Sequence, residues 1–498
     1  MTTSAERAWR CSVCGYVHRD AERPKSCPVC GSPEAAFEPH VDVAAPSAKA
    51  VARCWKCLNC GYIHHGNTPP DECPICTAAS DRFEPQEETQ EIVAATQKTV
   101  RVVVIGAGVA GLSAVESLRA ASPDAEITLV SKEPGLPYYR LNLTRYLAGE
   151  IGPEGLLIHP EEWYAQQGVS LLREAEISTL SLEESAVQLR GGEKLPFERL
   201  ILTVGAHSFL PPFPGAYREG VTTFRTLDDA DHILDAAKSG ATFVCIGGGV
   251  LGLETAGALA RRGVPVTLLE GYDWLMPRQL NQKAAELLRR HAAKLGITFR
   301  MKARTAEILG DERVRGVLLE GGDKLPADMV IVTTGIRSNS YLARMSGLEV
   351  NQGVLVDDHL FTSHPSVLAA GDVAEHRGVV YGIWGPSQYQ GSIAGMTAAG
   401  IQAEFGGIPR SNTLKVLGLE LFSIGQVAPD DGSFTVVEQE GDDRYYRFVF
   451  RDEHLVGAIL LGDASLTVAV KKTVETRADC SALLARNPNV GDVKTFLS

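Results

Sequence analysis

The sequence predicts a multidomain protein in which two small cysteine-rich domains precede an α/β region and a final α+β domain. Three observations predict this. A four-cysteine pattern occurs twice before residue 77, two strand–glycine loop–helix units follow, and alternating apolar strands lie near the C-terminus. A chain of 498 residues is too long for one core. Its 44% hydrophobic and 22% charged residues are typical of a globular protein.

Charge and cysteine use narrow the classes of function. A net charge of −13 argues against nucleic acid or an anionic membrane as partner, because phosphate binding needs clustered Lys and Arg. The first ten residues are polar and no apolar stretch resembling a signal peptide follows, so we expect a cytoplasmic protein. Nine of the eleven cysteines precede residue 77, which indicates metal or redox chemistry rather than disulfides.

The cysteine-rich region is a duplication with a constant offset of 46 residues. We predict one domain over residues 1–41, a linker over 42–52, a second domain over 53–86 and a tether over 87–98. The candidate metal ligands are Cys11, Cys14, Cys27 and Cys30 in the first copy and Cys57, Cys60, Cys73 and Cys76 in the second. Each copy is too short to bury a sufficient core, so a bound metal is expected to stabilise it.

The spacing of these cysteines is C-x2-C-x12-C-x2-C in both copies. Two such knuckles place four thiolates around one ion, which suits zinc or iron. The spacing alone leaves the metal open. Aromatic residues repeat beside the knuckles and would shield a redox iron from water, which favours iron modestly.

Two glycine loops dominate the α/β region. A strand at 102–105 runs into Gly-Ala-Gly-Val-Ala-Gly at 106–111, and a strand at 242–246 runs into Gly-Gly-Gly-Val-Leu-Gly at 247–252. Each loop opens a helix, and further strands are predicted at 126–130 and 264–269. This context indicates two dinucleotide-binding, Rossmann-like units. The expected contributors to turn, pyrophosphate approach and helix packing are Gly106, Gly108, Gly111, Gly247, Gly249 and Gly252.

An acidic residue after the second strand of each unit is expected to bind a ribose. Glu270 stands at that point in the second unit, and no Arg follows at once to hold a 2′-phosphate, so NADH is favoured over NADPH. In the first unit the acid is Glu133, slightly late in the sequence.

The order of these motifs resembles the two-dinucleotide flavoproteins of the pyridine-nucleotide oxidoreductase family, over about residues 99–410. Further marks of the family end at Gly205 (Leu-Thr-Val-Gly), surround Gly335 (Val-Thr-Thr-Gly-Ile-Arg) and end at Gly371 and Asp372 (Ala-Ala-Gly-Asp). The resemblance implies that Asp372 contacts the ribityl chain of FAD. It also implies an FAD-binding domain over 99–215 and 321–410, an NAD-binding domain over 216–320 and an α+β domain over 411–498.

Within the family, Pro-Tyr-Tyr-Arg at 137–140 and the segment 414–422 look most like NADH:rubredoxin reductases and the flavin part of assimilatory nitrite reductases. This resemblance implies catalytic or flavin-side roles for Glu254 near the nicotinamide and Arg140 near the flavin, and a capping role for Trp384. The alternatives are a carboxylate on a helix face, a surface arginine and a core tryptophan, respectively.

The cysteine modules resemble the short rubredoxin-like domain of rubrerythrins, over about residues 8–40 and 54–86. The resemblance rests on C-x2-C-G-Y-x-H and C-P-x-C followed by F-E-P. It implies one mononuclear iron per module, held by four cysteines.

The absence of cysteine from Thr77 to Val244 decides the predicted mechanism. Relatives that reduce disulfides or peroxide need a cysteine near the flavin, so a thiol route is excluded here. We therefore predict that NADH reduces FAD, and that FAD passes single electrons to the fused iron modules and on to a redox protein such as a rubrerythrin or flavodiiron-type protein.

Two other functions are compatible with parts of the sequence. In the main alternative the modules are zinc ribbons that dock a partner, and the flavoprotein reduces oxygen, quinone or that partner directly. The flavin component of a nitrite reductase is disfavoured because no cysteine set for a further cluster follows residue 410.

Overall fold

The computed structural model describes three strands and Lys25 within residues 8–40, residues 54–86 except 60–61, 66–67, 75 and 77, and residues 100–497 except 415–416 and 430. These residues fall into two compact units, Met1–Arg53 and Cys54–Ser498. In the described part of the chain, no helix has the length and apolar character needed to cross a membrane.

The first unit contains a three-stranded antiparallel sheet with the order β2-β1-β3. Its strands are β1 (Ala8–Cys11), β2 (Val17–Arg19) and β3 (Phe37–His40). The side chain of Cys11 and the whole of Cys14, Cys27 and Cys30 lie outside the described residues.

The second module repeats this sheet with β4 (Cys54–Cys57), β5 (Ile63–His65) and β6 (Phe83–Gln86) in the order β5-β4-β6. Trp9 pairs with His18 in the first module, and Trp55 pairs with His64 in the second. The offset of the sequence repeat is therefore preserved in the pairing register, which confirms two copies of one fold.

A parallel five-stranded sheet forms the core of the FAD-binding unit. Its order is β25-β13-β7-β8-β9, with β7 (Arg101–Ile105), β8 (Glu126–Val130), β9 (Val169–Leu172), β13 (Arg199–Leu202) and β25 (Val367–Ala369). Apolar β-branched residues and leucines make these strands buried, as a sheet covered on both faces requires.

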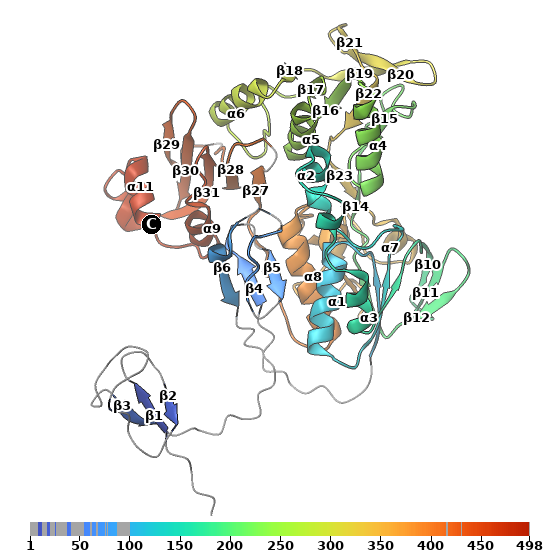
Figure 1. Ribbon diagram of the computed structural model, residues 1–498, viewed down its shortest axis with the longest axis vertical. Helices are drawn as coiled ribbons and strands as arrows, with labels where there is room; N and C mark the ends of the chain where they lie inside the picture. The colour runs from blue at the N-terminus through green and yellow to red at the C-terminus, as the bar shows by residue number, and fades with distance from the viewer. Residues whose placement is uncertain are drawn as a thin grey trace, which may run out of the picture. The chain divides into compact units, whose positions relative to one another are not determined.

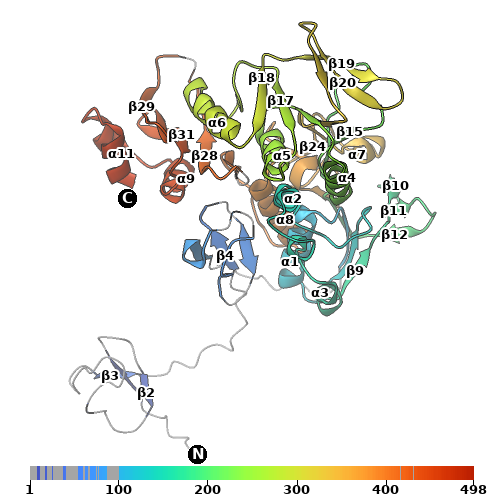
Figure 2. The ribbon, with the colours of Figure 1, turned by 45° about the horizontal axis from the view of Figure 1, so that its top comes forward.

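Two helices of this unit pack unusually closely. Figures 1 and 2 show α8 (Trp384–Ala398) lying along α1 (Val109–Ala121). A Cβ added at Gly391 would lie 2.2 Å from the carbonyl oxygen of Ala110, and one at Gly395 would lie 2.2 Å from that of Ala114. Only glycine permits this approach at either position.

The NAD-binding unit has a second parallel sheet with the order β15-β22-β16-β17-β18. Its strands are β15 (Val221–Thr223), β16 (Phe243–Ile246), β17 (Val266–Glu270), β18 (Ile297–Met301) and β22 (Met329–Val332). The predicted boundary after residue 320 cuts through this sheet, because β22 pairs with β15 and β16. The NAD-binding unit therefore extends through β22, and the chain returns to the FAD-binding unit after it.

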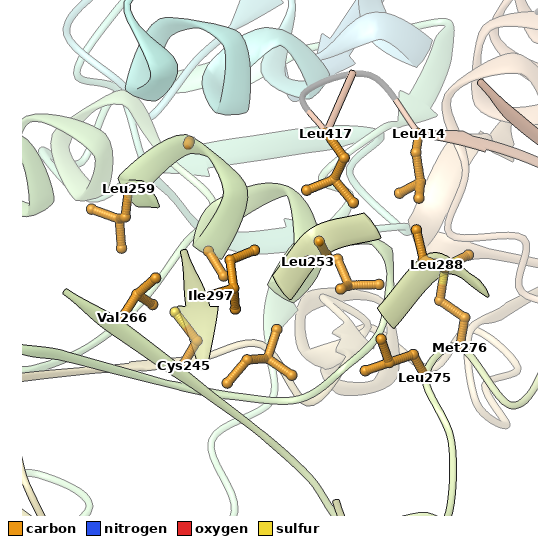
Figure 3. Close-up of a cluster of buried hydrophobic side chains, with 14 of the residues drawn as sticks. Cys245, Leu253, Leu259, Val266, Leu275, Met276, Leu288, Ile297, Leu414 and Leu417 are labelled. Carbon is orange, nitrogen blue, oxygen red and sulfur yellow. The ribbon is translucent and has the colours of Figure 1, made fainter. Parts of the chain in front are cut away.

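The last domain is an antiparallel sheet with the order β27-β28-β31-β30-β29, followed by short helices. Its elements are β27 (Ser411–Leu414), β28 (Leu421–Gly425), β29 (Thr435–Glu440), β30 (Tyr445–Arg451), β31 (His454–Leu461), α9 (Thr467–Glu475), α10 (Ser481–Leu484) and α11 (Val490–Leu497). Leu414 and Leu417 share one apolar cluster with Leu253 and Leu288 of the NAD-binding unit (Figure 3). This shared core fixes the last domain to the NAD-binding unit.

The remaining elements are helices and small sheets around these cores. They are α2 (Leu143–Ala148), α3 (Glu161–Gln166), α4 (Leu227–Lys238), α5 (Val250–Arg261), α6 (Gln282–Lys294), α7 (Tyr341–Met345), β10 (Ile177–Ser181), β11 (Ala186–Leu189), β12 (Lys194–Pro196), β14 (Ala206–Ser208), β19 (Thr305–Gly310), β20 (Val314–Leu319), β21 (Lys324–Pro326), β23 (Ile336–Ser338), β24 (Val354–Val356) and β26 (Ala374–His376). The multidomain α/β architecture predicted from the sequence is confirmed.

Candidate functional site

The candidate site is one cavity of about 1270 Å³ that several parts of the second unit line together. This exceeds the roughly 300–1,000 Å³ of a typical small-molecule pocket. The first glycine loop and the segment 131–144 form one wall, and Val250, Leu251 and Glu254 of α5 form another. Ile63 of the second cysteine module and Lys471 of the last domain also line it.

The first glycine loop has a backbone that only glycine can adopt. Gly106 has a φ of +109°, and a Cβ there would lie 2.2 Å from the carbonyl oxygen of Thr203. A Cβ at Gly111 would lie 1.9 Å from the carbonyl oxygen of Gly106. The Thr203 hydroxyl donates to that same oxygen over 2.8 Å. The glycine turn, the helix that follows it and the end of β13 therefore pack together through their backbone atoms.

The second glycine loop has the same construction. Gly247 has a φ of +117°, and a Cβ at Gly252 would lie 1.9 Å from the Gly247 carbonyl oxygen. Thr333 has the role that Thr203 has in the first loop. Its hydroxyl donates to the carbonyl oxygen of Gly247 over 3.2 Å. The two units are therefore built alike around their loops.

The starts of α1 and α5 have room for an anionic group. Gly108 and Gly249 are the N-cap residues, and neither helix receives a side-chain cap. No atom lies within 4 Å of a Cβ built at either glycine. Uncapped N–H groups at a helix start favour a phosphate, so both loops fit a dinucleotide pyrophosphate.

Glu133 and Arg140 form an ion pair in the wall of the cavity. Arg140 Nη2 donates to Glu133 Oε1 over 2.5 Å, and the Tyr138 hydroxyl donates to Glu133 Oε2 over 2.7 Å. Burial disfavours the charged carboxylate, but the Arg140 charge and the hydrogen bonds from Arg140 and Tyr138 together hold the pKa of Glu133 below its ordinary value. Arg140 is thus held in the cavity wall and is not a surface arginine.

Asp372 lies across the cavity at the turn after β25. Arg225 Nη2 donates to Asp372 Oδ2 over 2.9 Å, and the Ser387 hydroxyl donates to Oδ1 over 3.1 Å. Arg225 was missed by the sequence analysis, because it precedes α4 without any motif. Its carbonyl oxygen also accepts from Arg140 Nη1 over 2.6 Å, which links the two ion pairs.

Glu254 lies on α5 where the NAD-binding unit faces the FAD-binding unit. Its side chain is buried, and Oε2 accepts from the Thr144 hydroxyl of α2 over 2.7 Å. It also lines the cavity. The carboxylate is therefore not one on a solvated helix face.

Six predicted cofactor residues lie outside the cavity lining: Gly111, Gly247, Gly249 and Gly252 of the glycine loops, and Glu270 and Gly335. Glu270 ends β17, where its carboxylate accepts from the N–H of Gly248 over 2.8 Å and from that of Tyr272 over 2.9 Å. Gly335 lies between β22 and β23 with a φ of +120°. By contrast, Gly205 and Gly371 line the cavity.

Trp384 opens α8 and faces both the cavity and the cysteine module. Its indole Nε1 is buried, and no described residue accepts a hydrogen bond from it. Nε2 of Gln390, further along α8, is also buried, and no described residue accepts a hydrogen bond from it. Buried donors of this kind normally have a partner, and Trp384 lines the cavity, so its indole fits a bound group with acceptor oxygens or nitrogens.

Three thiols of the second module converge on one point. The sulfur atoms of Cys57, Cys73 and Cys76 all lie within 4.8 Å of one another, and those of Cys57 and Cys76 are 3.6 Å apart. Two ligands of a tetrahedral tetrathiolate, with metal–sulfur bonds of about 2.3 Å, stand about 3.8 Å apart. The thiols therefore fit a single metal ion. Cys60, the predicted fourth ligand, lies outside the described residues.

The thiol cluster is continuous with the cavity wall. Cys57, Cys73, Tyr62 and Tyr139 belong to one buried apolar cluster, and Trp384 packs against it. The Tyr139 and Trp384 rings have centroids 5.5 Å apart. In Figure 1 the second module lies beside α8. Tyr139 and Trp384 thus lie in the apolar cluster that contains the thiols, and Trp384 also lines the cavity.

Comparison with known proteins identifies the family. A model of pyridine nucleotide-disulphide oxidoreductases matches residues 100–403. The chain belongs to this family. Residues 411–478 match the rubredoxin NAD+ reductase C-terminal domain. Residues 9–38 and 55–84 match the rubredoxin-like domain of rubrerythrin.

This oxidoreductase resembles several characterised relatives. It is 34% identical to nitrite reductase [NAD(P)H] of Bacillus subtilis over 76% of this chain and 48% of the relative. It is 28% identical to NADH-rubredoxin oxidoreductase of Clostridium acetobutylicum over 76% of this chain and 95% of the relative. The crystal structure of the latter matches with a TM-score of 0.67 and 26% identity, covering 80% of this chain and all (100%) of that one.

The chain spans about half the length of the curated relatives from Bacillus subtilis that it matches, a nitrite reductase and an assimilatory nitrate reductase electron transfer subunit. The resemblance to the pyridine-nucleotide oxidoreductases and to rubrerythrin-type modules, predicted from the sequence, is confirmed. The family supports FAD and NADH as the bound groups, and the rubredoxin-like modules support metal-binding cysteines.

Proposed function

We propose that this oxidoreductase transfers electrons from NADH through FAD to its own rubredoxin-like metal centres, and from them to a separate redox protein. One observation supports this proposal most strongly. Cys57, Cys73 and Tyr139 share a buried cluster against which Trp384 packs, and Trp384 also lines the cavity. FAD supplies the conversion between two-electron hydride chemistry and single-electron transfer.

The residues of the chain bind and orient in this proposal. The N–H groups at the starts of α1 and α5 would hold the two pyrophosphates, as Gly108 and Gly249 leave space there. Asp372 would bind the ribityl chain, and Glu254 would stand at the nicotinamide. Arg140, held by Glu133 at the cavity wall, would favour negative charge on the reduced flavin.

We propose iron rather than zinc in both modules. Zinc has no accessible redox chemistry, so zinc sites beside a flavin would carry no electrons. Aromatic rings enclose the described thiols, as the shielding of a redox metal requires. A cytoplasmic location is part of the proposal, because thiolate ligands persist in a reducing compartment. For the final acceptor we propose a rubrerythrin or flavodiiron-type protein.

Electron counting under exclusion of air tests the function. FAD takes two electrons and each ferric ion takes one, so complete reduction should consume about two NADH per chain, with loss of the visible ferric-thiolate absorption. Cys11→Ser and Cys57→Ser should each remove one iron signal and leave flavin reduction intact. Zinc in both sites, with about one NADH consumed per chain, would instead support zinc ribbons and a direct acceptor.

A further inference from the structure

The second cysteine module is attached to the FAD-binding unit by the carboxamide of Gln388. β5 is the outer strand of the module, and Gln388 lies on α8 with 4% of its surface exposed. Its Oε1 accepts from the N–H of Ile63 over 3.1 Å, and its Nε2 donates to the carbonyl oxygen of Ile63 over 3.1 Å. One side chain therefore satisfies the open edge of β5 as a neighbouring strand would.

Asn142 makes the equivalent contact with the other knuckle. Its Nδ2 donates to the carbonyl oxygen of Pro74 over 2.6 Å. Pro74 directly follows Cys73 in the knuckle that contains Cys73 and Cys76. Asn142 is 2% exposed, so the donor side of this bond is shielded from water.

Gln388 therefore holds the strand that follows the Cys57–Cys60 knuckle, and Asn142 holds the knuckle that contains Cys73 and Cys76. The N–H of Cys57 donates to the carbonyl oxygen of Tyr62 over 2.6 Å, and Tyr62 precedes the residue that Gln388 binds. Asn142 precedes α2 and Gln388 lies in α8, so both amides project from elements beside the cavity wall. The thiol cluster is thereby fixed against Tyr139 and Trp384.

We propose that Asn142 and Gln388 are positioning residues that fix the second module as the immediate electron acceptor of the flavin. The inference rests on the proposed function and deepens it, since it assigns the entry site to one of the two modules. In each step reduced FAD would give one electron to the ferric iron of the second module, and the ferrous iron would pass it on to the first module or to the redox protein before the next step. Two such steps would return FAD to its oxidised form and release its proton to solvent.

The test uses full-length protein with Cys11→Ala and Cys14→Ala, so that iron remains only in the second module. In this parent, Gln388→Met and Asn142→Leu keep the side-chain volume and remove the hydrogen bonds. We expect flavin reduction by NADH to stay within about twofold, and iron reduction in the double variant to slow by about tenfold or more, as a displaced reacting centre predicts. Stopped-flow absorption follows both events in one trace.

Controls separate positioning from damage to the metal site. Gln402→Met is the matched control, because it makes the same substitution at an exposed glutamine. Gln388→Glu keeps an acceptor for the N–H of Ile63 and should give an intermediate rate. The ferric absorption spectrum should remain that of the parent in every variant, which a merely structural defect would alter.

Three results would overturn the inference. An unchanged rate of iron reduction in the double variant would mean that the amide contacts with the second module do not set the rate of electron transfer from the flavin. Loss of the ferric spectrum would mean that the amides maintain the metal site itself. If the parent reduces its flavin while the iron stays ferric, the proposed function fails, and the inference fails with it.

Discussion

The hydroxyl groups of Tyr62 and Tyr139 lie 3.2 Å apart, across the contact between the second cysteine module and the FAD-binding unit. Both side chains are buried, and their rings meet nearly edge to face at 74°. Burial raises the pKa of both phenols, that of Tyr139 to about 12. Burial therefore favours the neutral form of both phenols at the contact between the two parts.

The first prediction concerns alkaline pH. The ordinary pKa of tyrosine is about 10, so the stabilisation from Tyr139 is complete below that pH and is lost as the pH rises towards about 12. Protease cleavage in the 87–98 tether should accelerate over this window, if the module separates. Tyr139→Phe should flatten the pH dependence and cost about 1–3 kcal/mol near neutrality, because the buried Tyr62 hydroxyl loses its partner. Tyr217→Phe, at an 87% exposed tyrosine, serves as the control and should leave the profile unchanged.

The second prediction separates the two glycine loops. Gly252→Val should abolish reduction by NADH, because even its Cβ would lie 1.9 Å from the Gly247 carbonyl oxygen. The flavin should remain bound, since the first loop is untouched. Added dithionite should still reduce it. Gly432→Ala is the control, as no atom lies within 4 Å of a Cβ there. Loss of flavin from the Gly252 variant would contradict the prediction that the two loops bind their dinucleotides independently.

The third prediction concerns the bond between Glu254 and Thr144, which joins the two nucleotide units. Thr144→Val should remove one hydrogen-bond donor from the buried carboxylate and lower stability by about 1–3 kcal/mol. Glu254→Gln keeps an acceptor for Thr144, whereas Glu254→Leu does not. We expect the rate of flavin reduction by NADH to fall in both Glu254 variants, and urea unfolding to shift strongly only in the leucine variant. Equal rates in wild type and both variants would exclude Glu254 from the nicotinamide site.

The fourth prediction tests a mechanism without a redox thiol. Cys245 is 0% exposed in β16, and burial raises the pKa of its thiol to about 12, so it stays protonated at neutral pH. Cys245→Ala should leave flavin reduction by NADH unchanged and cost about 1–2 kcal/mol of stability through the small cavity it creates. Mass spectrometry after iodoacetamide treatment should find Cys245 modified only in unfolded protein. Inactivation by its alkylation in the native state would revive a thiol route.

The elements that the sequence predicted well are those with strong local constraints. Glycines at Gly106 and Gly247 fix their turns, since both positions have positive φ and face backbone atoms. The duplicated module was readable because its cysteines and aromatics recur without an insertion. Local pattern and tertiary structure agree at these places.

Long-range features could not be read in this way. β22 follows β18 by about thirty residues in sequence, yet pairs between β15 and β16, so no local signal marked the domain boundary. The docking of the second module uses the backbone of Ile63 and Pro74, and backbone groups are identical at every position. Arg225 likewise gains its role only from the fold, which brings it to Asp372.

The close contact of α1 with α8 has a consequence for electron transfer. α1 begins at the loop expected to hold the flavin pyrophosphate, and α8 contains both Trp384 and Gln388. Because glycines at 391 and 395 let these helices touch through their main chains, no flexible side chain acts as a spacer between them. The packed backbones then fix the distance between the flavin site and the metal site of the second module. Thermal motion of surface groups would leave this electron-tunnelling distance almost unaltered.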